Sequence, residues 1–398
     1  MSNKGALNNI KVLDLTRVLA GPYCTMMLGD MGAEIIKIER PIVGDDSREF
    51  GPFVEGQSAY YMNLNRNKKG ITLNLKDPEG KKMFIDMVKN ADIVIENYRP
   101  GTMEKLGLGY EDLKKINPGI VYGCVSGFGH YGPYKNRAGY DIIAQAMGGL
   151  MSTTGWPDGE PTRTGTAMGD VLAGLSITIG ILAALNYKKD TGIGQKVDVA
   201  LVDSVVSSLE IINQIYLVEG RIPQKIGNRY ESTYPYDSFK CKDGSMVIGC
   251  ANDKLWGSLC TVMGNPQLAD NEKYDKNIKR VNKHEEIKTI VEQWSKKGTI
   301  DQNVEDLLAV GIPASPINTI DRIVKDPHIA GAREMFVEVE HPIAGKVKIT
   351  GSQLKFSETK VEIKMPSPLL GQDNEKVYKE IFNFDDNKLK ELKEKKII

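Results

Sequence analysis

Short apolar runs alternate with amphipathic segments along the first part of the chain. The apolar or alternating runs predict strands at 10–15, 32–38, 71–75, 91–96 and 119–125. The segments between them predict helices at 21–31, 78–90 and 110–116. Strands separated by helix-length segments indicate an α/β fold, with a mostly parallel sheet covered on both faces. Such sheets bind ligands at the loops beyond the carboxyl ends of their strands.

The middle of the chain holds a long, almost uncharged run over 171–185. It predicts a buried core helix that ends near Lys188, Lys189 and Gly192, because basic residues and then glycine are typical of a helix C-terminus. The run is shorter than the ~20 residues that a membrane span needs, and we expect no membrane partner. Residues 196–209 predict a strand that leads into a helix.

The length and the later pattern predict two domains. We expect a large Rossmann-like domain over 1–205, a linker over 206–235 and a small α+β domain over 236–320. The small domain begins with hairpin-like strands at 238–242 and 246–251. Residues 321–398 return to the large domain, with strands near 336–341 and 345–349 and a charged helix from Asn374.

Composition narrows the function classes. The formal net charge is zero, with 41% hydrophobic and 26% charged residues, which disfavours a nucleic-acid partner. The five cysteines form no Cys-x-x-Cys pair and the N-terminus has no leader pattern, so we expect reduced thiols and a cytoplasmic location. No two of the four histidines have metal-ligand spacing, so no metal site is expected.

Asp170 is a lone carboxylate at the start of the predicted core helix, in Thr164-Gly-Thr-Ala-Met-Gly-Asp170. It could be a helix N-cap, since Asp is a preferred cap. It could also be a nucleophile that the helix N-terminus keeps ionised, although the local pattern alone favours the cap. The local pattern leaves both interpretations open.

Glycine-bearing turns with positive charge follow several predicted strands, while Gly-x-Gly-x-x-Gly, P-loop, HExxH and Gly-x-Ser-x-Gly motifs are absent from the sequence. At one edge of a parallel sheet these turns would suit a phosphate-rich, nucleotide-type ligand. They lie at 17–22, 38–40, 65–70, 97–101 and 126–133.

Seven blocks, in this order, resemble the class III CoA-transferase family, which includes formyl-CoA and carnitine CoA-transferases. They are Asp14-Leu-Thr-Arg-Val-Leu-Ala-Gly-Pro22, Gly32-Ala-Glu-Ile-Ile-Lys-Ile-Glu-Arg40, Asn65-Arg-Asn-Lys-Lys-Gly70, Glu96-Asn-Tyr-Arg-Pro-Gly101, Ser126-Gly-Phe-Gly-His-Tyr-Gly-Pro133, Gly139-Tyr-Asp-Ile-Ile-Ala-Gln145 and Gly165-Thr-Ala-Met-Gly-Asp170. The resemblance implies an interlocked homodimer. It also implies acyl-CoA and a small carboxylic acid as substrates, with no permanently bound cofactor.

The family's nucleophilic aspartate matches Asp170. The resemblance implies that Asp170 attacks an acyl-CoA thioester to give an aspartyl mixed anhydride, and that exchange then passes through an aspartyl-CoA thioester. Asp141 either assists in this turn or makes a structural hydrogen bond.

The resemblance also carries over positions that contact CoA. Relatives often have Gln at the position of Leu19 and Phe at that of Tyr98, so those two contacts differ here. The matching positions are Val18, Leu19, Ala20, Arg40, Leu73, Lys76, Asn97, Tyr98, Lys105, Arg137 and Tyr140.

Two other functions compete with transfer. One is an α-methylacyl-CoA racemase, whose relatives place a catalytic histidine at the position of Tyr140. Tyrosine, with a pKa near 10, is a poor replacement, which favours the transferase. The other is a CoA-binding module without catalysis. The chain lacks the formyl-type poly-glycine stretch, which disfavours oxalate and leaves carnitine-like, hydroxy, aryl and dicarboxylic acids open.

Overall fold

The computed structural model describes residues 5–398 and divides into two compact units. Unit 1 runs up to Leu150 and includes Thr164–Ile211 and Pro327–Ile398. Unit 2 comprises Met151–Arg163 and Ile212–Asp326.

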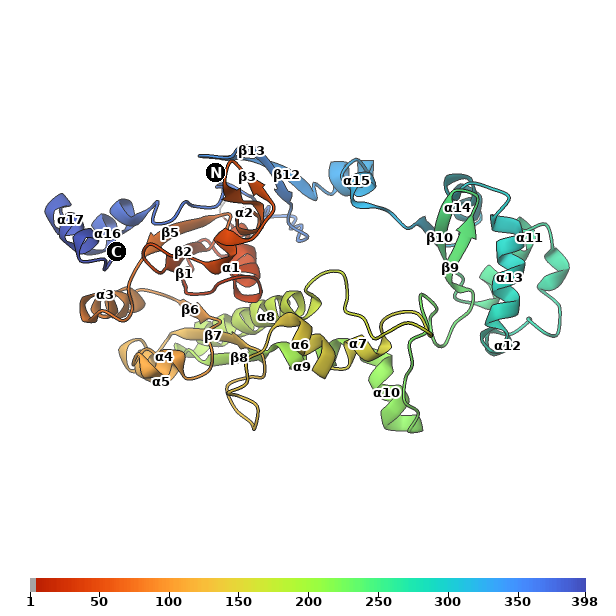
Figure 1. Cartoon of the computed structure of the whole chain (residues 1–398), viewed down its shortest axis with the longest axis horizontal. Helices are drawn as coiled ribbons and strands as arrows, with labels where there is room; N and C mark the ends of the chain where they lie inside the picture. The colour runs from red at the N-terminus through yellow and green to blue at the C-terminus, as the bar shows by residue number, and fades with distance from the viewer. Residues whose placement is uncertain (1–4) are drawn as a thin grey trace. The chain divides into compact units, whose positions relative to one another are not determined.

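Unit 1 is built on a six-stranded sheet in the order β5-β2-β1-β6-β7-β8, in which every neighbouring pair is parallel (Figure 1). Along the chain the strands are β1 (Lys11–Asp14), β2 (Glu34–Glu39), β5 (Lys68–Thr72), β6 (Ile93–Glu96), β7 (Val121–Ser126) and β8 (Lys196–Ala200).

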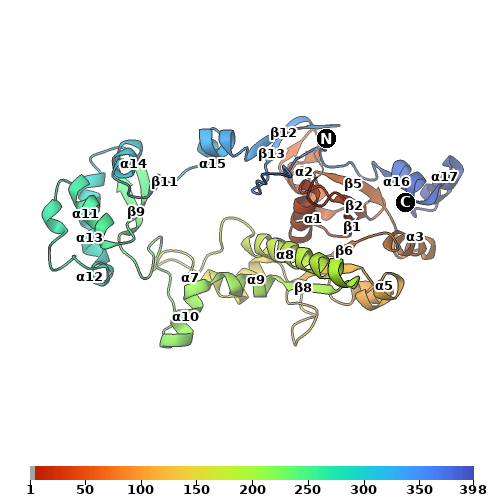
Figure 2. The ribbon, with the colours of Figure 1, turned by 180° about the vertical axis from the view of Figure 1, so that it is seen from behind.

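Helices cover both faces of this sheet. One face packs against α3 (Pro78–Val88), α4 (Thr102–Lys105), α5 (Tyr110–Ile116), α16 (Asn374–Phe382) and α17 (Asp386–Glu394). The other packs against α1 (Ala20–Asp30), α6 (Asp141–Met147), α8 (Met168–Thr191) and α9 (Leu201–Ser208) (Figure 2). The predicted parallel sheet with helices on both faces is therefore confirmed.

The α8 helix is long and apolar enough to cross a membrane by length and composition. In unit 1 it lies against α1, β7 and β8, and its Ala173, Ile177 and Ile181 are fully buried there. It ends as predicted at Gly192, which adopts the left-handed conformation (φ 74°) that glycine tolerates. The helix thus serves as a core helix of this unit.

Shorter elements complete unit 1. Between β2 and β5 lie η1 (Asp46–Glu49), the two-stranded β3 (Phe53–Val54) and β4 (Gln57–Ser58), and α2 (Ala59–Leu64). Near the end come η3 (Pro327–Ala332) and the antiparallel pair β12 (Phe336–His341) and β13 (Gly345–Thr350).

Unit 2 contains a three-stranded antiparallel sheet in the order β11-β10-β9, with β9 (Tyr236–Cys241), β10 (Gly244–Gly249) and β11 (Ala314–Pro316). Its core gathers Phe239 and Met246 from the strands with Trp256, Val291 and Leu307 from the helices. The helices are α11 (Asp253–Val262), η2 (Pro266–Leu268), α12 (Asn277–Asn282), α13 (His284–Ser295), α14 (Ile300–Ala309) and α15 (Ile320–Ile323).

Two sequence predictions of local structure need correction. The third strand runs over Lys68–Thr72 instead of 71–75, because the buried Lys68 pairs with Asp14 and can occupy an interior position. The predicted linker contains α10 (Glu210–Glu219), which bends by 74° from α9. This helix and α7 (Leu150–Thr153) each begin in unit 1 and continue into unit 2. Within the predicted linker, residues 220–235 contain neither helix nor strand.

Candidate active site

Asp170 lies in the first turn of α8, and the N-cap position belongs to Ala167, which makes no side-chain cap. The N-cap interpretation of Asp170 is therefore wrong. A helix of this length presents free backbone N–H groups and a positive partial charge at its start. The Asp170 carboxylate stands in that field, partly buried.

The capping role belongs to Asp141, at the start of α6. Its Oδ1 accepts hydrogen bonds from the backbone N–H of Gly169 at 2.8 Å and of Asp170 at 3.4 Å. A Cβ at Gly169 would lie 3.1 Å from the same oxygen, so glycine permits this approach. The structural hydrogen bond foreseen for Asp141 is confirmed.

A buried glutamine fixes Asp141 and the segment before α8. The Gln145 side chain, fully buried, donates to Asp141 Oδ2 at 2.7 Å. Its Oε1 accepts from the Thr164 backbone N–H at 3.0 Å and from the Thr164 hydroxyl at 3.2 Å. Thr164, Gln145 and Asp141 therefore hold the start of α8 in one position.

Burial and the negative charge of Asp141 raise the pKa of Asp170 to about 7. Burial, Asp170 and two further aspartates also raise the pKa of the Tyr60 phenol, which is therefore a neutral hydrogen-bond donor. A carboxylate with such a pKa is more basic than an ordinary aspartate, and half of it is ionised near neutral pH. The higher basicity suits a carboxylate nucleophile, but half protonation near neutral pH means that the helix start does not keep Asp170 fully ionised, contrary to the expectation from the sequence.

The start of α1 lies beside α8 one turn after Asp170. A Cβ at Gly174 would be only 2.9 Å from the Ala20 carbonyl oxygen, so glycine allows the two helices to touch there. Ala20 is the first residue of α1, and Val18 and Leu19 precede it. The predicted CoA-contacting turn is thus placed next to the helix that carries Asp170.

Side chains from elsewhere in unit 1 fix the backbone of this turn. Asn97 accepts from the Arg17 backbone N–H at 2.9 Å and donates to the Arg17 carbonyl at 2.7 Å. Asp45 Oδ1 accepts from the Val18 N–H at 3.1 Å. Val18 has φ 66°, which is strained for a β-branched residue, so these bonds maintain an unfavourable conformation.

Below the turn lies a network of buried charges. Lys37 Nζ is 2.8 Å from Asp45 Oδ2 and also donates to the Thr16 carbonyl. Although burial opposes ionisation of both groups, their attraction raises the pKa of Lys37 and lowers that of Asp45. A second pair, Lys68 and Asp14 at 3.1 Å, lies beside it, and Asp14 accepts from the Thr16 N–H at 2.9 Å.

Two adjoining cavities of about 370 and 270 Å³ open at the ends of β1 and β2. The predicted CoA positions Arg40 and Tyr98 line both, and Leu73 and Lys76 line the larger one. The larger is mostly apolar, while Arg17, Arg40 and Arg99 line the smaller. An apolar cavity next to three guanidinium groups suits an adenine next to phosphates.

The remaining predicted positions lie outside these two cavities. Val18, Leu19 and Ala20 belong to the adjoining turn, and the polar atoms of Asn97 are engaged with Arg17. Lys105 is exposed in the last turn of α4. The Arg137 guanidinium stacks 3.6 Å from the Tyr134 ring centroid, and Tyr140 is 76% exposed just before α6.

Sequence reasoning missed several lining residues. Arg17 and Arg99 belong to the sequence blocks that carry the family resemblance, and their positive charge was the signal that could have identified them as phosphate partners. Lys396 lines the larger cavity from the far end of the chain, where the local sequence gives no signal.

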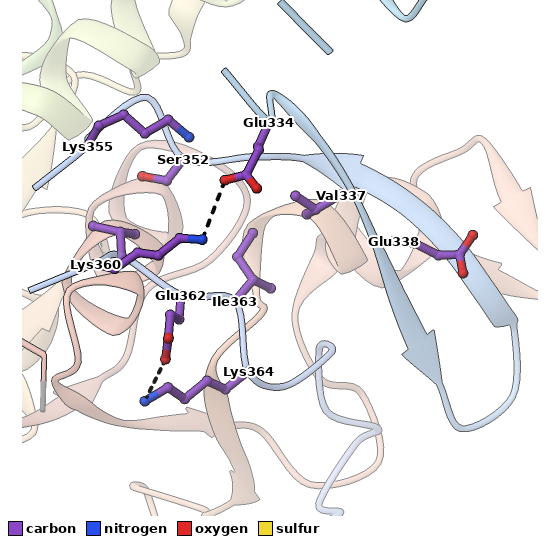
Figure 3. A pocket seen from close by; sticks show the side chains of 10 residues that line it. Glu334, Val337, Glu338, Ser352, Lys355, Lys360, Glu362, Ile363 and Lys364 are labelled. Carbon is purple, nitrogen blue, oxygen red and sulfur yellow. Dashed lines mark ion pairs between the residues drawn. The ribbon is translucent and has the colours of Figure 1, made fainter. Parts of the chain in front are cut away.

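Another hollow of unit 1 is lined by Glu334, Val337, Glu338 and segment 352–364 (Figure 3). Its charges are largely paired with one another. Lys360 is 3.7 Å from Glu334 and Lys364 is 3.1 Å from Glu362. It shares no residue with the two cavities beside the turn.

Comparisons with known proteins agree with the resemblance. The sequence model of the family described as CoA-transferase family III matches residues 7–374 of this chain. Human succinyl-CoA:glutarate CoA-transferase is 40% identical over 393 residues, covering 98% of this chain and 90% of that protein. Succinyl-CoA:mesaconate CoA-transferase of Haloarcula marismortui is 41% identical over 375 residues, 92% of each chain.

The fold has a solved counterpart as well. A crystal structure of a CAIB/BAIF family protein from Brucella suis is similar with a TM-score of 0.84 and 37% identity, covering 95% of this chain and 100% of that one. Family match, relatives and structure point the same way: this chain belongs to CoA-transferase family III and is an enzyme of that class, with CoA thioesters as substrates.

Proposed function

We propose that this enzyme moves CoA from an acyl-CoA donor to a free dicarboxylic acid, with Asp170 as the nucleophile. The observation that supports it best is the position of Asp170 in the first turn of α8, where Asp141 holds the backbone and where the helix meets the start of α1 one turn later, at Gly174. The acid class comes from the relatives, whose names pair succinyl-CoA with glutarate or mesaconate.

Each step of the proposed reaction consumes one anionic nucleophile and releases one anionic leaving group. The Asp170 carboxylate attacks the thioester carbonyl, which gives a mixed anhydride and releases CoA thiolate. The thiolate attacks the aspartyl carbonyl and expels the donor acid, leaving an aspartyl-CoA thioester. The acceptor carboxylate attacks this thioester and releases the thiolate again. Attack of the thiolate on the acceptor's acyl carbon then yields the new acyl-CoA and restores Asp170.

The site provides what these steps require of the protein. The raised pKa makes the Asp170 carboxylate a better nucleophile than an ordinary one, at the cost of partial protonation near pH 7. The cavities lined by Arg40 and Tyr98 would hold the nucleotide end of CoA. The start of α1 carries backbone N–H groups that can stabilise a developing oxyanion, whereas the N–H groups of Gly169 and Asp170 at the start of α8 already donate to Asp141.

Trapping the acyl-enzyme tests the proposal. Wild-type protein incubated with succinyl-CoA and then hydroxylamine should carry a hydroxamate on the peptide that contains Asp170, detected by mass spectrometry. Asp170→Asn should lose both the hydroxamate and CoA exchange while still binding CoA. Solvent deuterium at the α-carbon of a methyl-branched acyl-CoA, without exchange, would indicate a racemase instead. CoA binding without either signal would indicate a binding module.

Stability separates loss of chemistry from loss of folding. Because the pKa of Asp170 is raised in the folded protein, its ionisation costs stability as pH rises from about 4 through 7. Asp170→Asn should therefore unfold at the same temperature as wild type or higher at pH 8. A variant that exchanged CoA at near wild-type rates would contradict the nucleophile assignment.

We also propose a cytoplasmic homodimer with interlocked chains. All five cysteines are buried, unpaired thiols, which fits a reducing compartment. Large apolar side chains remain exposed on α8, α9 and α10, as at a subunit interface. They include Ile179, Tyr187, Val206, Leu217 and Val218. Sedimentation equilibrium should give twice the chain mass.

A further inference from the structure

Three side chains form a row across neighbouring strands of unit 1. Glu96 at the end of β6 is the register partner of Cys124 on β7, and Cys124 is the register partner of Asp198 on β8. Register partners in a parallel sheet place their side chains on the same face, about 4.8 Å apart. Glu96 and Cys124 are almost completely buried, at 1% and 0% exposure.

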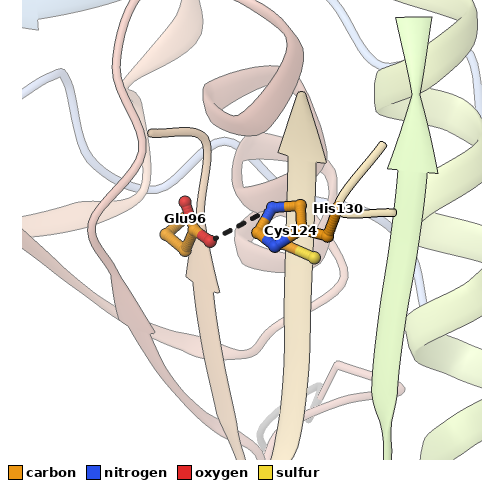
Figure 4. Close-up of side chains that lie close together, drawn as sticks. All are labelled: Glu96, Cys124 and His130. Atoms are coloured by element: carbon orange, nitrogen blue, oxygen red, sulfur yellow. Dashed lines mark ion pairs between the residues drawn. The ribbon is translucent and has the colours of Figure 1, made fainter. Parts of the chain in front are cut away.

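His130 approaches this row from the loop after β7. Its backbone N–H donates to Asp198 Oδ2 at 2.9 Å, which anchors the loop to the sheet. Its side chain is 7% exposed, and its buried Nε2 has no hydrogen-bond partner. Figure 4 shows Glu96, Cys124 and His130 directed at one another, and their ligand atoms lie within 4.8 Å of one another.

Each carboxylate has one oxygen held by a backbone N–H and the other facing the cluster. Glu96 Oε2 accepts from the Tyr98 N–H at 2.7 Å, while Oε1 lies 3.8 Å from His130 Nε2 and also accepts from the Tyr122 hydroxyl at 3.3 Å. Asp198 Oδ1 lies 3.8 Å from Cys124 Sγ. Hydrogen bonds that orient a ligand through its second atom are typical of metal sites.

We propose that Glu96, Cys124 and His130, with Asp198 as fourth ligand, form a structural site for a zinc-type divalent cation. One thiolate, one imidazole and two carboxylates are ligands that zinc accepts in a tetrahedron. Tetrahedral ligand atoms stand roughly 3.3 to 3.8 Å apart. The Nε2–Oε1 and Sγ–Oδ1 pairs already have this separation. The ligand atoms of Glu96, Cys124 and His130 need to approach by up to about 1 Å, and Asp198, which lies outside that group of three, must move further to complete the tetrahedron.

Lys196 lies next to the proposed site and determines which nitrogen of His130 carries the proton. Its Nζ lies 3.1 Å from His130 Nδ1, and since an ammonium can only donate, the ring proton is on Nε2. Metal binding through Nε2 would move that proton to Nδ1 and turn Lys196 from the ring. Three anionic ligands around a divalent ion leave one negative charge, which the ammonium nearby would balance.

The ion would attach the loop that carries His130 to the strand ends. The segment continues to Tyr140 and Asp141, the residue that caps α8. The proposed role is therefore stabilisation of this loop, apart from the transfer chemistry.

Cobalt titration of the full-length, EDTA-treated protein tests the site. Co²⁺ should bind with one equivalent per chain and give a thiolate-to-cobalt charge-transfer absorption, which Zn²⁺ then displaces. Cys124→Ser should lose this absorption, while Cys250→Ser, at a buried thiol of unit 2, should keep it.

His130→Asn is the second variant. His130 lies in a loop, so this substitution leaves the sheet intact. It should weaken Zn²⁺ binding at least about tenfold and reduce the rise in melting temperature that Zn²⁺ gives to wild type. Absence of the absorption in wild type would overturn the proposal. So would an absorption that survives Cys124→Ser, or a Zn²⁺ affinity unchanged in His130→Asn.

Discussion

Two of the buried polar clusters near the carboxyl ends of the strands in unit 1 differ in how completely their groups are paired. In the cluster beneath the Thr16–Val18 turn, Lys37 and Lys68 each meet an opposite charge at hydrogen-bond distance. In the cluster around Cys124, His130 Nε2 has no partner, and Glu96 Oε1 lies 3.8 Å from it.

The difference separates two uses of buried polarity. A fully paired cluster stabilises one backbone conformation, here the strained Val18 beside the two cavities at the ends of β1 and β2. A cluster with an unpaired, oriented group carries a cost that a bound ligand can offset. If this distinction holds, the paired cluster is a structural scaffold that maintains the conformation of the Thr16–Val18 turn.

The largest effect is expected from breaking the paired cluster. Lys37→Met leaves Asp45 buried and uncompensated, so the free energy of unfolding should fall by about 3–5 kcal/mol. The matched control is Lys379→Met, which removes exposed ion pairs with Glu375 and Asp386 and should cost less than about 1 kcal/mol. Urea unfolding at pH 7 measures both.

The same pair predicts a pH dependence. The pKa of Asp45 is lowered in the folded protein, so its stabilising contribution is present above about pH 4 and is lost as acid protonates it. The penalty of Lys37→Met should therefore shrink at lower pH, because protonation removes the uncompensated charge. A penalty of similar size for both lysine variants, or one that grows in acid, would show that the pair is not a scaffold.

A smaller effect is expected one layer higher, at Asn97. Asn97→Ala removes both hydrogen bonds to the Arg17 backbone, each worth about 1 kcal/mol. The turn should then relax, and the KM for the CoA thioester should rise about tenfold or more with a smaller change in kcat. Asn97→Asp keeps the acceptor and should be intermediate. Steady-state kinetics with varied acyl-CoA would contradict the scaffold role if only kcat fell.

The sequence could predict features that depend on neighbouring residues better than features that depend on residues far apart in the chain. The alternation of strands and helices is local, so the α/β sheet and its two covered faces could be predicted. The position of Asp170 at the start of α8 could also be predicted, because the glycine-bearing block and the apolar run adjoin.

Features that depend on strand register or on contacts between distant segments could not be predicted from the sequence. Spacing in the sequence cannot show that Glu96, Cys124 and Asp198 are register neighbours, since two crossovers separate them. It misplaced the start of β5, because a buried lysine is acceptable only once Asp14 is known to pair with it. The true cap of α8, Asp141, was likewise hidden by the segment between α6 and α8.

The smallest effect concerns Asp141, which both caps α8 and opposes the charge of Asp170. Asp141→Asn keeps an oxygen for the Gly169 N–H but removes the negative charge that helps to raise the pKa of Asp170. In wild type, activity should rise with pH through about 7, because the nucleophile must be ionised. In Asp141→Asn this limb of the kcat/KM profile should move to lower pH.

Asp141→Ala separates the two roles of this residue. It removes the cap as well as the charge, so it should shift the limb in the same direction and also cost about 1 kcal/mol of stability. Asp141→Asn should lose less stability than Asp141→Ala, because its oxygen still accepts from Gly169 although its NH2 group then faces the Gln145 donor. If the limb stays near pH 7 in both variants, burial alone raises the pKa of Asp170. Asp141 would then act only as a cap that accepts from backbone N–H groups, as Asp45 does for the N–H of Val18.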